Sequence, residues 1–320
     1  MESRSTDAGC DQSFAEKIVE NEMASSNTKK ILLTGEDQTL EQLLATVVSP
    51  STIQTVPTNQ ECLERVKMEL YDLVITDFHT SAAEDVDLLK QIREIRPETK
   101  VIAMADESTP EDVIQLIKEH AFSFFSQAFD PEQLLGMVAD ALELPGWKDD
   151  IEILSARPEW IALRLHCRKL TTERLLQFMR ELEMDLPVAE RENIGTAFRE
   201  MLLNAIEHGA KYDPRKTVDV SYVRTSRVII YQIRDPGQGF SFEQLPHAAI
   251  SNPPDNPAEH ILYRMEHGLR AGGFGILMVN SLVDELFYNE KGNEVLMIKF
   301  LAAPATVEES ERVPLFNTTE

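Results

Sequence analysis

The chain has 320 residues, with 55 acidic and 31 basic side chains and a formal net charge of −24. A chain this acidic repels phosphate, which excludes nucleic acid and anionic membrane surfaces as partners. The three cysteines, Cys10, Cys62 and Cys167, share no C-x-x-C spacing, which excludes a disulfide framework and a zinc site. The sequence shows no signal peptide and no apolar run near the ~20 residues that span a bilayer, so we expect a soluble cytoplasmic protein.

The first part of the chain predicts an α/β domain. Residues 1–28 lack periodicity and are rich in Ser, Glu and Asp, so we expect a disordered arm. From residue 29, short apolar runs alternate with amphipathic stretches, which indicates a doubly wound parallel sheet over 29–145. The predicted strands are 31–34, 53–56, 73–76, 101–104 and 121–125, and the predicted helices are 39–48, 60–70, 84–95, 110–120 and 130–143. Thr109 and Asp130, each followed by proline, predict two of the helix starts.

A second domain is predicted over 150–303, after the Pro-Gly break near residue 145. It begins with a strand at 151–154 and two long helices at 159–184 and 188–208, the second with Gly209 as its C′ glycine. Helices followed by neighbouring strands predict an α/β sandwich, with helices on one face of a mixed sheet. The later elements are strands at 216–224, 227–234, 285–289 and 294–301, a helix at 274–284, and a disordered tail over 304–320.

Three polar residues recur along the second of these helices. Glu200, Asn204 and His208 are spaced i, i+4 and i+8, so they share one stripe beside the apolar face. A bound Mg²⁺–triphosphate would give them the partner that buried polar groups require. Asn204 can offer an oxygen to Mg²⁺, and Glu200 is placed to accept a proton from an attacking hydroxyl or water. An ordinary amphipathic helix with a solvated polar side is the alternative.

Two glycine-containing segments follow. Asp235, Gly237 and Gly239 come after an apolar strand, where a carboxylate can accept the adenine amino group and glycines allow close backbone approach. Alone, this segment is also a good turn. Gly273 and Gly275 open the predicted helix at 274–284, so backbone N–H groups are available to phosphate oxygens. In this order, the three segments together predict an ATP site.

These segments resemble the GHKL superfamily, whose ATP-binding unit is the Bergerat fold, over 151–302. In this resemblance Glu200 and Asn204 match the N box, Asp235, Gly237 and Gly239 the G1 box, and Gly273 and Gly275 the G2 box. The segments 151–159 and 204–209 look like the anti-sigma factor serine kinases, whereas histidine kinases carry Asn at position 200 and a His-bearing dimerisation unit.

The resemblance implies an ATP- and Mg²⁺-dependent protein serine/threonine kinase of a bacterial partner-switching pathway. Its partner would be a STAS-domain anti-anti-sigma protein, with a sigma factor as a further partner and a homodimer as one arrangement. Glu200 would be the general base and Asn204 the magnesium ligand. Two alternatives stay open: a nucleotide-gated sequestering switch without catalysis, and a histidine kinase-like phosphodonor acting in trans. In the long lid over 240–272, Arg270 or Arg264 reaches the γ-phosphate or is simply solvated.

Residues 30–143 resemble a response regulator receiver domain. Asp77 ends the third predicted strand, where open α/β sheets bind ligands, and matches the family's phosphoacceptor aspartate. The supporting residues differ: the acidic pair appears as Gly35-Glu36 with Asp37 next, the hydroxyl residue as Ala105, and the lysine as Gln127. We therefore interpret this domain as a pseudo-receiver that serves dimerisation or partner docking and regulates the kinase. Phosphorylation of Asp77 with altered coupling is the alternative.

Overall fold

The computed structural model describes residues 29–35, 37–48, 52–144, 149–157, 159–240, 259–266 and 274–301. The chain divides into two compact units. The first extends to Asp149 and also includes Glu173–Met184, and the second comprises Asp150–Thr172 and the chain from Asp185 onward. Within the described part of the chain, none of the helices has the length and apolar character needed to cross a membrane. The predicted disordered arm (1–28) and tail (304–320) lie outside the described residues.

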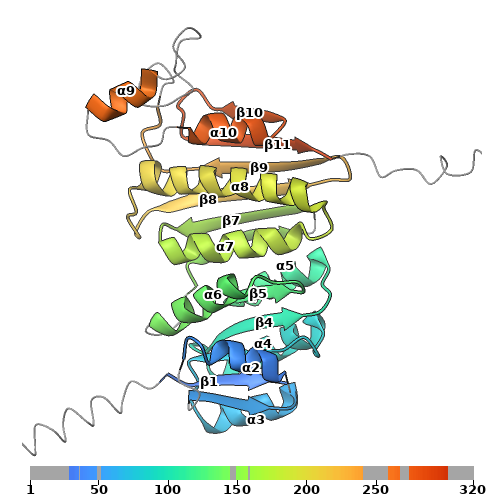
Figure 1. Cartoon of the computed structure of the whole chain (residues 1–320). Helices are drawn as coiled ribbons and strands as arrows, with labels where there is room; N and C mark the ends of the chain where they lie inside the picture. Colours follow the sequence, from blue (N-terminus) through green and yellow to red (C-terminus); the bar gives the residue numbers. More distant parts are fainter. Residues whose placement is uncertain are drawn as a thin grey trace, which may run out of the picture. The chain divides into compact units, whose positions relative to one another are not determined.

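The first unit is built on a five-stranded parallel sheet with the order β2-β1-β3-β4-β5. This order is that of the flavodoxin-like doubly wound fold, so the predicted fold is confirmed. The strands are β1 (Ile31–Thr34), β2 (Ile53–Val56), β3 (Leu73–Ile75), β4 (Lys100–Ala105) and β5 (Ser123–Ser126). The helices are α2 (Gln38–Leu44), α3 (Asn59–Met68), α4 (Ala82–Ile95), α5 (Pro110–Lys118) and α6 (Pro131–Glu143) (Figure 1).

Local side-chain signals start the helices of this unit. Thr109 and Asp112 form a capping box at the start of α5, and Ser81 forms one with Glu84 at the start of α4. The Asp130 side chain accepts a hydrogen bond from a backbone N–H in the first turn of α6. The starts predicted at Thr109 and Asp130 are therefore confirmed.

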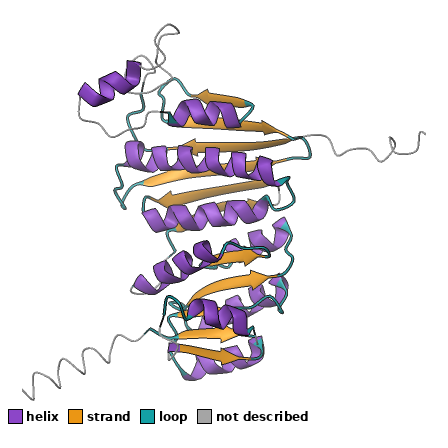
Figure 2. Ribbon diagram, viewed as in Figure 1, coloured by secondary structure: helices purple, strands orange, loops and turns teal. Residues whose placement is uncertain are grey.

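The second unit contains a six-stranded sheet with the order β10-β11-β9-β8-β7-β6. Every neighbouring pair is antiparallel, so the predicted mixed sheet is wrong. Three of the pairs, β6–β7, β8–β9 and β10–β11, are successive strands joined by short turns, which pair antiparallel. The strands are β6 (Ile151–Arg157), β7 (Trp160–His166), β8 (Thr217–Arg224), β9 (Val228–Arg234), β10 (Glu285–Tyr288) and β11 (Glu294–Phe300). Helices α8 (Val188–Asn204) and α10 (Gly275–Leu282) lie on one face of this sheet, and α9 (Glu259–Glu266) precedes α10 (Figure 2).

The predicted helix over 159–184 is wrong in its first third. Residues 160–166 form β7, and only Lys169–Leu182 is helical, as α7. Leu, Ala and Arg are good helix formers, which misled the prediction. The segment becomes a strand because it pairs along its length with β6 on one side and β8 on the other. Long-range pairing overrides local propensity here.

Helix α7 packs into the first unit beside the edge strand β5. Three of its buried side chains, spaced so that they share one helix face, bond to every second residue from Phe122 to the end of β5. Arg174 Nε donates to Phe122 O at 2.7 Å, Gln177 Nε2 donates to Phe124 O at 2.9 Å, and Ser126 Oγ donates to Glu181 Oε2 at 2.5 Å. The helix thereby covers a sheet edge that would otherwise expose unpaired backbone groups.

Arg174 is the central side chain of this contact. It is 2% exposed and donates further to Ala121 O at 3.2 Å and to Asp149 Oδ1 at 2.9 Å. Its guanidinium also lies 5.0 Å from the centre of the Phe122 ring. Asp149 contacts His120 Nδ1 at 2.8 Å as well, so this carboxylate joins α7 to the turn before β5.

Candidate functional site

The helix α8 ends in a change of helical geometry at the predicted N box. Glu200 and Asn204 are half-buried on α8, whereas His208 is exposed on the π-helix η2 (Ala205–Ala210) that continues it. A π-helix has i→i+5 hydrogen bonds, so four residues no longer complete a turn and His208 leaves the stripe of the other two. The predicted C′ role of Gly209 is wrong, because the left-handed residue is Lys211, with φ of 62°.

Gly209 instead allows η2 to approach the end of β9. A Cβ on Gly209 would lie 2.2 Å from Asp235 Oδ1, and one on Gly237 would lie 2.6 Å from the same oxygen. The Gly237 N–H donates to Asp235 Oδ1 at 2.7 Å, which fixes the carboxylate. Burial raises the pKa of Asp235 above its ordinary value, opposed by this hydrogen bond and by the charge of Lys291.

Two asparagines of the β10–β11 turn hold the backbone of Asp235, and sequence reasoning missed them. Asn293, 6% exposed, donates from Nδ2 to Asp235 O at 2.9 Å and accepts from Asp235 N through its backbone oxygen at 3.0 Å. Asn289 Nδ2 donates to Asn293 Oδ1, and Asn293 N donates to Asn289 Oδ1, both at 3.1 Å. The only sequence signal was a turn rich in Asn and Gly, 54 to 58 residues after Asp235.

The same turn presses against the segment after β9. Gly239 and Gly292 both have φ of 75°, in the region that favours glycine. A Cβ on Gly239 would lie 1.8 Å from Lys291 O, and one on Gly292 would lie 2.1 Å from Phe240 O. The backbone of the β10–β11 turn therefore contacts the backbone after β9 directly, and neither glycine has room for a side chain.

Gly239→Ala is expected to weaken nucleotide binding at least about tenfold, because a left-handed alanine costs roughly 1–2 kcal/mol before the clash with Lys291 is counted. The matched control is Gly195→Ala in the middle of α8, where no atom lies within 4 Å of the added Cβ. This control is expected to stabilise the protein by about 0.5–1 kcal/mol and to leave binding unchanged. Titration with a fluorescent ADP analogue, together with thermal melting, measures both; equal affinities would contradict the strain argument.

The start of α10 lies against Glu200. A Cβ on Gly275, the first residue of α10, would lie 2.1 Å from Glu200 Oε1. The side chain of Phe274, at the N-cap of α10, makes no capping hydrogen bond. Burial, followed by the charges of Asp235 and Glu200, raises the pKa of Tyr288, whose hydroxyl contacts Met201 Sδ at 3.2 Å. The charges of Asp235 and Glu200 therefore both act on the Tyr288 hydroxyl.

The fold thus brings five of the predicted site residues together from three segments of the chain. They are Glu200 and Asn204 of α8, Asp235 and Gly237 after β9, and Gly275 of α10. Gly273 and Arg270 lie outside the described residues, and so does the side chain of Arg264. No group of three or more His, Cys, Asp or Glu side chains suited to a metal occurs among the residues that the structure describes.

This arrangement fits an adenine nucleotide. The carboxylate at the end of β9 is fixed through Oδ1 by Gly237, and glycines line the approach from η2 and from the turn. A carboxylate held in this way can accept an amino group, and a backbone without side chains admits a flat ring. The uncapped start of α10, next to Glu200, supplies N–H groups suited to phosphate oxygens.

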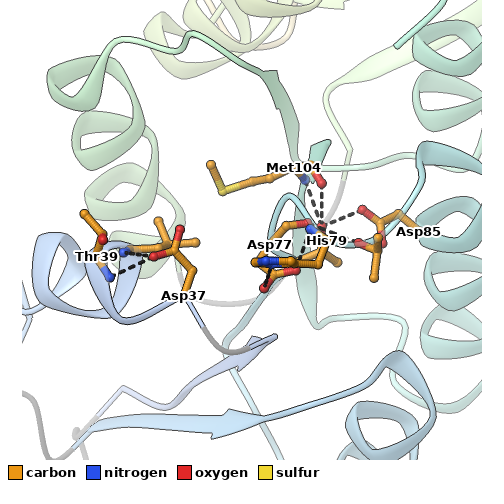
Figure 3. A network of polar contacts seen from close by, with 9 residues as sticks. Asp37, Thr39, Asp77, His79, Asp85 and Met104 are labelled. Carbon is orange, nitrogen blue, oxygen red and sulfur yellow. Dashed lines mark hydrogen bonds and ion pairs between the residues drawn. The ribbon is translucent and has the colours of Figure 1, made fainter. Parts of the chain in front are cut away.

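In the first unit, Asp77 follows the central strand β3 and is fully buried. Its Oδ1 accepts from His79 N at 3.0 Å, and its Oδ2 lies 2.8 Å from His79 Nδ1 (Figure 3). A Cβ on Gly35 would lie 1.5 Å from Oδ2, so the backbone after β1 covers the same oxygen. Both carboxylate oxygens are therefore covered by neighbouring groups.

The other receiver positions also differ from a phosphorylation site. Asp37 caps α2, where its Oδ1 accepts from Thr39 N at 2.8 Å, and it lies apart from the Asp77 cluster (Figure 3). Ala105 is buried at the end of β4, and Gln127 is exposed after β5. Glu36 lies outside the described residues.

A second buried carboxylate lies beside Asp77. Asp85 accepts from Thr76 Oγ1 at 2.5 Å and from Asn59 Nδ2 at 3.1 Å, and Met104 N donates to Thr76 Oγ1 at 2.8 Å. Burial raises the pKa of Asp85 to about 6, with a further rise from the Asp77 charge, although hydrogen bonds from Thr76, Thr80 and Asn59 oppose it.

Because the pKa of Asp85 is higher in the folded state than in the unfolded state, its stabilising effect is complete at low pH. It is lost as the pH rises through about 6, and the shift corresponds to about 3 kcal/mol. We expect the free energy of unfolding to fall between about pH 4 and pH 7 in the wild type and to lose this component in Asp85→Asn. Urea unfolding followed by circular dichroism measures it. Asp87→Asn, at an exposed position of the same helix, is the control and is expected to keep the wild-type profile.

Family comparisons agree with this architecture. Residues 31–139 match the response regulator receiver domain, and residues 167–299 match the histidine kinase-like ATPase domain. The chain is a receiver domain joined to a histidine kinase-like ATPase domain of the GHKL type. Such an ATPase domain implies ATP binding.

Individual relatives match one half each. The serine-protein kinase RsbW of Oceanobacillus iheyensis is 25% identical over 112 residues, which cover 35% of this chain and 66% of that protein. The response regulator protein PilR of Pseudomonas aeruginosa is 27% identical over 149 residues, covering 44% of this chain and 34% of that protein. The chain thus spans a third of PilR and just under two thirds of RsbW. A solved CheY-like receiver domain from Methanospirillum hungatei is 20% identical, with a TM-score of 0.32 and coverage of 36% of this chain and 94% of that one.

Proposed function

We propose that this protein is an ATP- and Mg²⁺-dependent protein serine/threonine kinase that phosphorylates a STAS-domain protein and acts as a partner-switching regulator. The observation that carries the proposal is the position of Glu200. Its carboxylate lies against Gly275, at the start of α10, on the same side of the unit as Asp235. A proton acceptor beside the expected phosphate position is what transfer to a hydroxyl requires. The likeness to a serine-protein kinase supports the choice of acceptor.

Each residue of the site has a chemical part in this proposal. Asp235 accepts a hydrogen bond from the adenine amino group, and Asn204 provides an oxygen to magnesium. Bound Mg-ATP supplies the γ-phosphoryl group and the charge neutralisation that its transfer needs. Glu200 takes the proton of the serine hydroxyl as the new O–P bond forms, and the bond to the β-phosphate oxygen breaks with ADP as the leaving group.

The receiver domain is proposed to regulate this kinase as a pseudo-receiver. Asp77 is fully buried, with both oxygens covered by His79 and the Gly35 backbone. The positions of the metal-binding pair hold Gly35 and Glu36, and the position of the hydroxyl residue holds Ala105. Signalling is therefore assigned to docking of a partner on the folded domain rather than to an aspartyl phosphate.

The test is phosphotransfer from Mg-ATP. The purified chain is incubated with STAS-domain proteins from the same genome, and phosphosites are located by mass spectrometry. An acid-stable phosphoserine or phosphothreonine on one of these proteins is the expected result. An acid-labile phosphohistidine on another protein would instead establish the phosphodonor alternative.

A sequestering switch predicts a different outcome. In that case no transfer occurs, and partner affinity survives Glu200→Ala but is lost in Asp235→Asn, because only nucleotide binding matters. Isothermal titration of the partner against both variants, with and without ATP, separates the two functions. Tight Asp235-dependent ATP binding without transfer would overturn the kinase proposal.

A further inference from the structure

Helix α10 presents apolar side chains to solvent. Phe274, at its N-cap, is 47% exposed, and Leu277 and Met278 are 44% and 37% exposed. Residues spaced i, i+3 and i+4 share one face of a helix, whereas Val279, which is fully buried, lies on the opposite face. Because α10 packs on α8, the exposed residues lie on a side of α10 that this contact leaves uncovered (Figure 1). We call Phe274, Leu277 and Met278 the α10 stripe.

The α10 stripe begins beside the proposed proton acceptor. Gly275 directly follows Phe274, and a Cβ on Gly275 would lie 2.1 Å from Glu200 Oε1. Leu277 and Met278 come within the next turn, about 3–5 Å further along the helix axis. The carboxylate of Glu200 and the α10 stripe therefore belong to one small region of the second unit.

This region differs in charge from the rest of the chain. Residues 274–283 contain no Asp, Glu, Lys, Arg or His, whereas the whole chain has 55 acidic and 31 basic side chains and a net charge of −24. A partner that approaches most of the surface meets an excess of negative charge, but at α10 it meets an uncharged helix. The α10 stripe offers no ion pairs, so contact with it depends on the burial of apolar surface.

The chemistry of phosphotransfer indicates what covers the α10 stripe. A serine or threonine hydroxyl must come within hydrogen-bond distance of Glu200 before its proton can be taken. When that hydroxyl belongs to a folded protein, the surface around the hydroxyl has to contact the surface around Glu200. The α10 stripe is an exposed, apolar and uncharged part of that surface.

The size of the α10 stripe also fits a substrate that leaves after each reaction. A helix of eight residues is about 12 Å long, so one side of it offers on the order of 100–150 Å². Stable protein pairs bury about 800 Å² on each partner, which is several times larger. A second copy of the chain, held permanently, would need a much larger contact. A phosphorylated substrate has to dissociate, which a small contact allows.

We propose that the protein substrate docks on the α10 stripe through apolar, uncharged side chains that lie within about 10 Å, or two helical turns, of its phosphoacceptor hydroxyl. This inference rests on the proposed function and adds the surface that selects the substrate. The contact is the same in the ground state and in the transition state. It therefore lowers the KM for the protein substrate and leaves kcat unchanged.

The first experiment measures steady-state phosphotransfer from Mg-ATP to the STAS-domain protein that the full chain phosphorylates. In the double variant Leu277→Gln, Met278→Gln, the KM for this protein is expected to rise at least about tenfold, while kcat and the affinity for an ATP analogue stay within about threefold. Glutamine removes apolar contact without adding a charge near the phosphates. Val188→Gln is the matched control. Val188 is 58% exposed at the start of α8, 12 residues before Glu200, so this variant is expected to keep the wild-type KM.

A second experiment does not require catalysis. The photoreactive p-benzoylphenylalanine is placed at position 277 of the full chain, which is mixed with Mg²⁺, a non-hydrolysable ATP analogue and each purified STAS-domain protein of the same genome. After irradiation, mass spectrometry locates the crosslinks. Crosslinks to apolar residues close to a serine or threonine of one STAS-domain protein are the expected result. The same crosslinks without phosphotransfer in the first experiment would support docking and overturn the kinase proposal.

Other results would overturn the docking proposal. An unchanged KM in the folded double variant would do so and would leave the kinase proposal in place. Crosslinks from position 277 only to residues 259–266 would mean that α9 covers the stripe, since Ile261, Leu262 and Met265 of α9 are 41%, 56% and 73% exposed. The absence of both phosphotransfer and crosslinks to any STAS-domain protein would overturn docking together with the proposed function.

Discussion

Replacing Glu200 with glutamine is expected to lower the rate of phosphotransfer at least about 100-fold, the lower bound for losing a general base. Glutamine keeps the shape of the side chain against Gly275 but cannot take the serine proton. ATP affinity is therefore expected to stay within about threefold of the wild type. Single-turnover phosphotransfer and equilibrium binding of an ATP analogue measure the two quantities separately.

Glu207→Gln is the matched control for this prediction. Glu207 lies on η2, seven residues further on, and accepts a hydrogen bond from the Tyr212 hydroxyl at 3.3 Å at an exposed position. Its replacement removes the same charge from the same helical segment, so a general electrostatic effect would appear in both variants. Equal losses in the two variants would mean that Glu200 acts only through its charge.

Replacing Arg174 with methionine is expected to destabilise the first unit by about 3–5 kcal/mol, the usual cost of removing one partner of a buried ion pair. The change leaves the carbonyl oxygens of Ala121 and Phe122 without their donor and removes the contact with Asp149. Methionine keeps most of the side-chain volume, so the loss reports on the polar contacts. Urea unfolding and hydrogen exchange of the β5 amides measure it.

Arg180→Met provides the comparison on the same helix. The Arg180 guanidinium bonds to Gln133 Oε1 at 2.8 Å, but this contact is exposed. Exposed polar pairs contribute at most about 1 kcal/mol, so this variant is expected to unfold close to the wild type. If both variants lost stability equally, the buried hydrogen bonds between α7 and residues 122–126 would not be what holds α7 in place.

Local signals explain what the sequence could predict. The parallel sheet of the first unit followed from alternating apolar runs and from helix starts such as Thr109 and Asp130, whose partners lie within three residues. The meeting of Glu200 with Gly275, and of Gly209 with Asp235, is consistent with the three segments proposed for the ATP site. Glycine is required at 209 and 275 because a Cβ there would overlap with the carboxylates of Asp235 and Glu200.

The remaining features depend on contacts between distant parts of the chain. β7 is a strand because β6 and β8 pair with it, although its residues favour a helix. Asn293 donates a hydrogen bond to Asp235 from 58 residues away, and no sequence pattern near either residue predicts this hydrogen bond. The π-helix that turns His208 out of its stripe contains Gly209, which packs closely on Asp235, 26 residues further along the chain. Periodicity does not encode such interactions.

Helix α7 has a consequence for how these two domains can be exchanged between proteins. By sequence it lies inside the ATPase family match, yet from Glu173 it belongs to the first compact unit and covers the edge of the receiver sheet. A recombination at the Pro-Gly segment near residue 145 would give the receiver a bare sheet edge and separate Arg174 from its acceptors Ala121 O and Phe122 O. The boundary of the ATPase family match and the boundary of the compact unit therefore differ in this chain. Transfer of this receiver domain to another protein would therefore have to include α7 to keep the edge of its sheet covered.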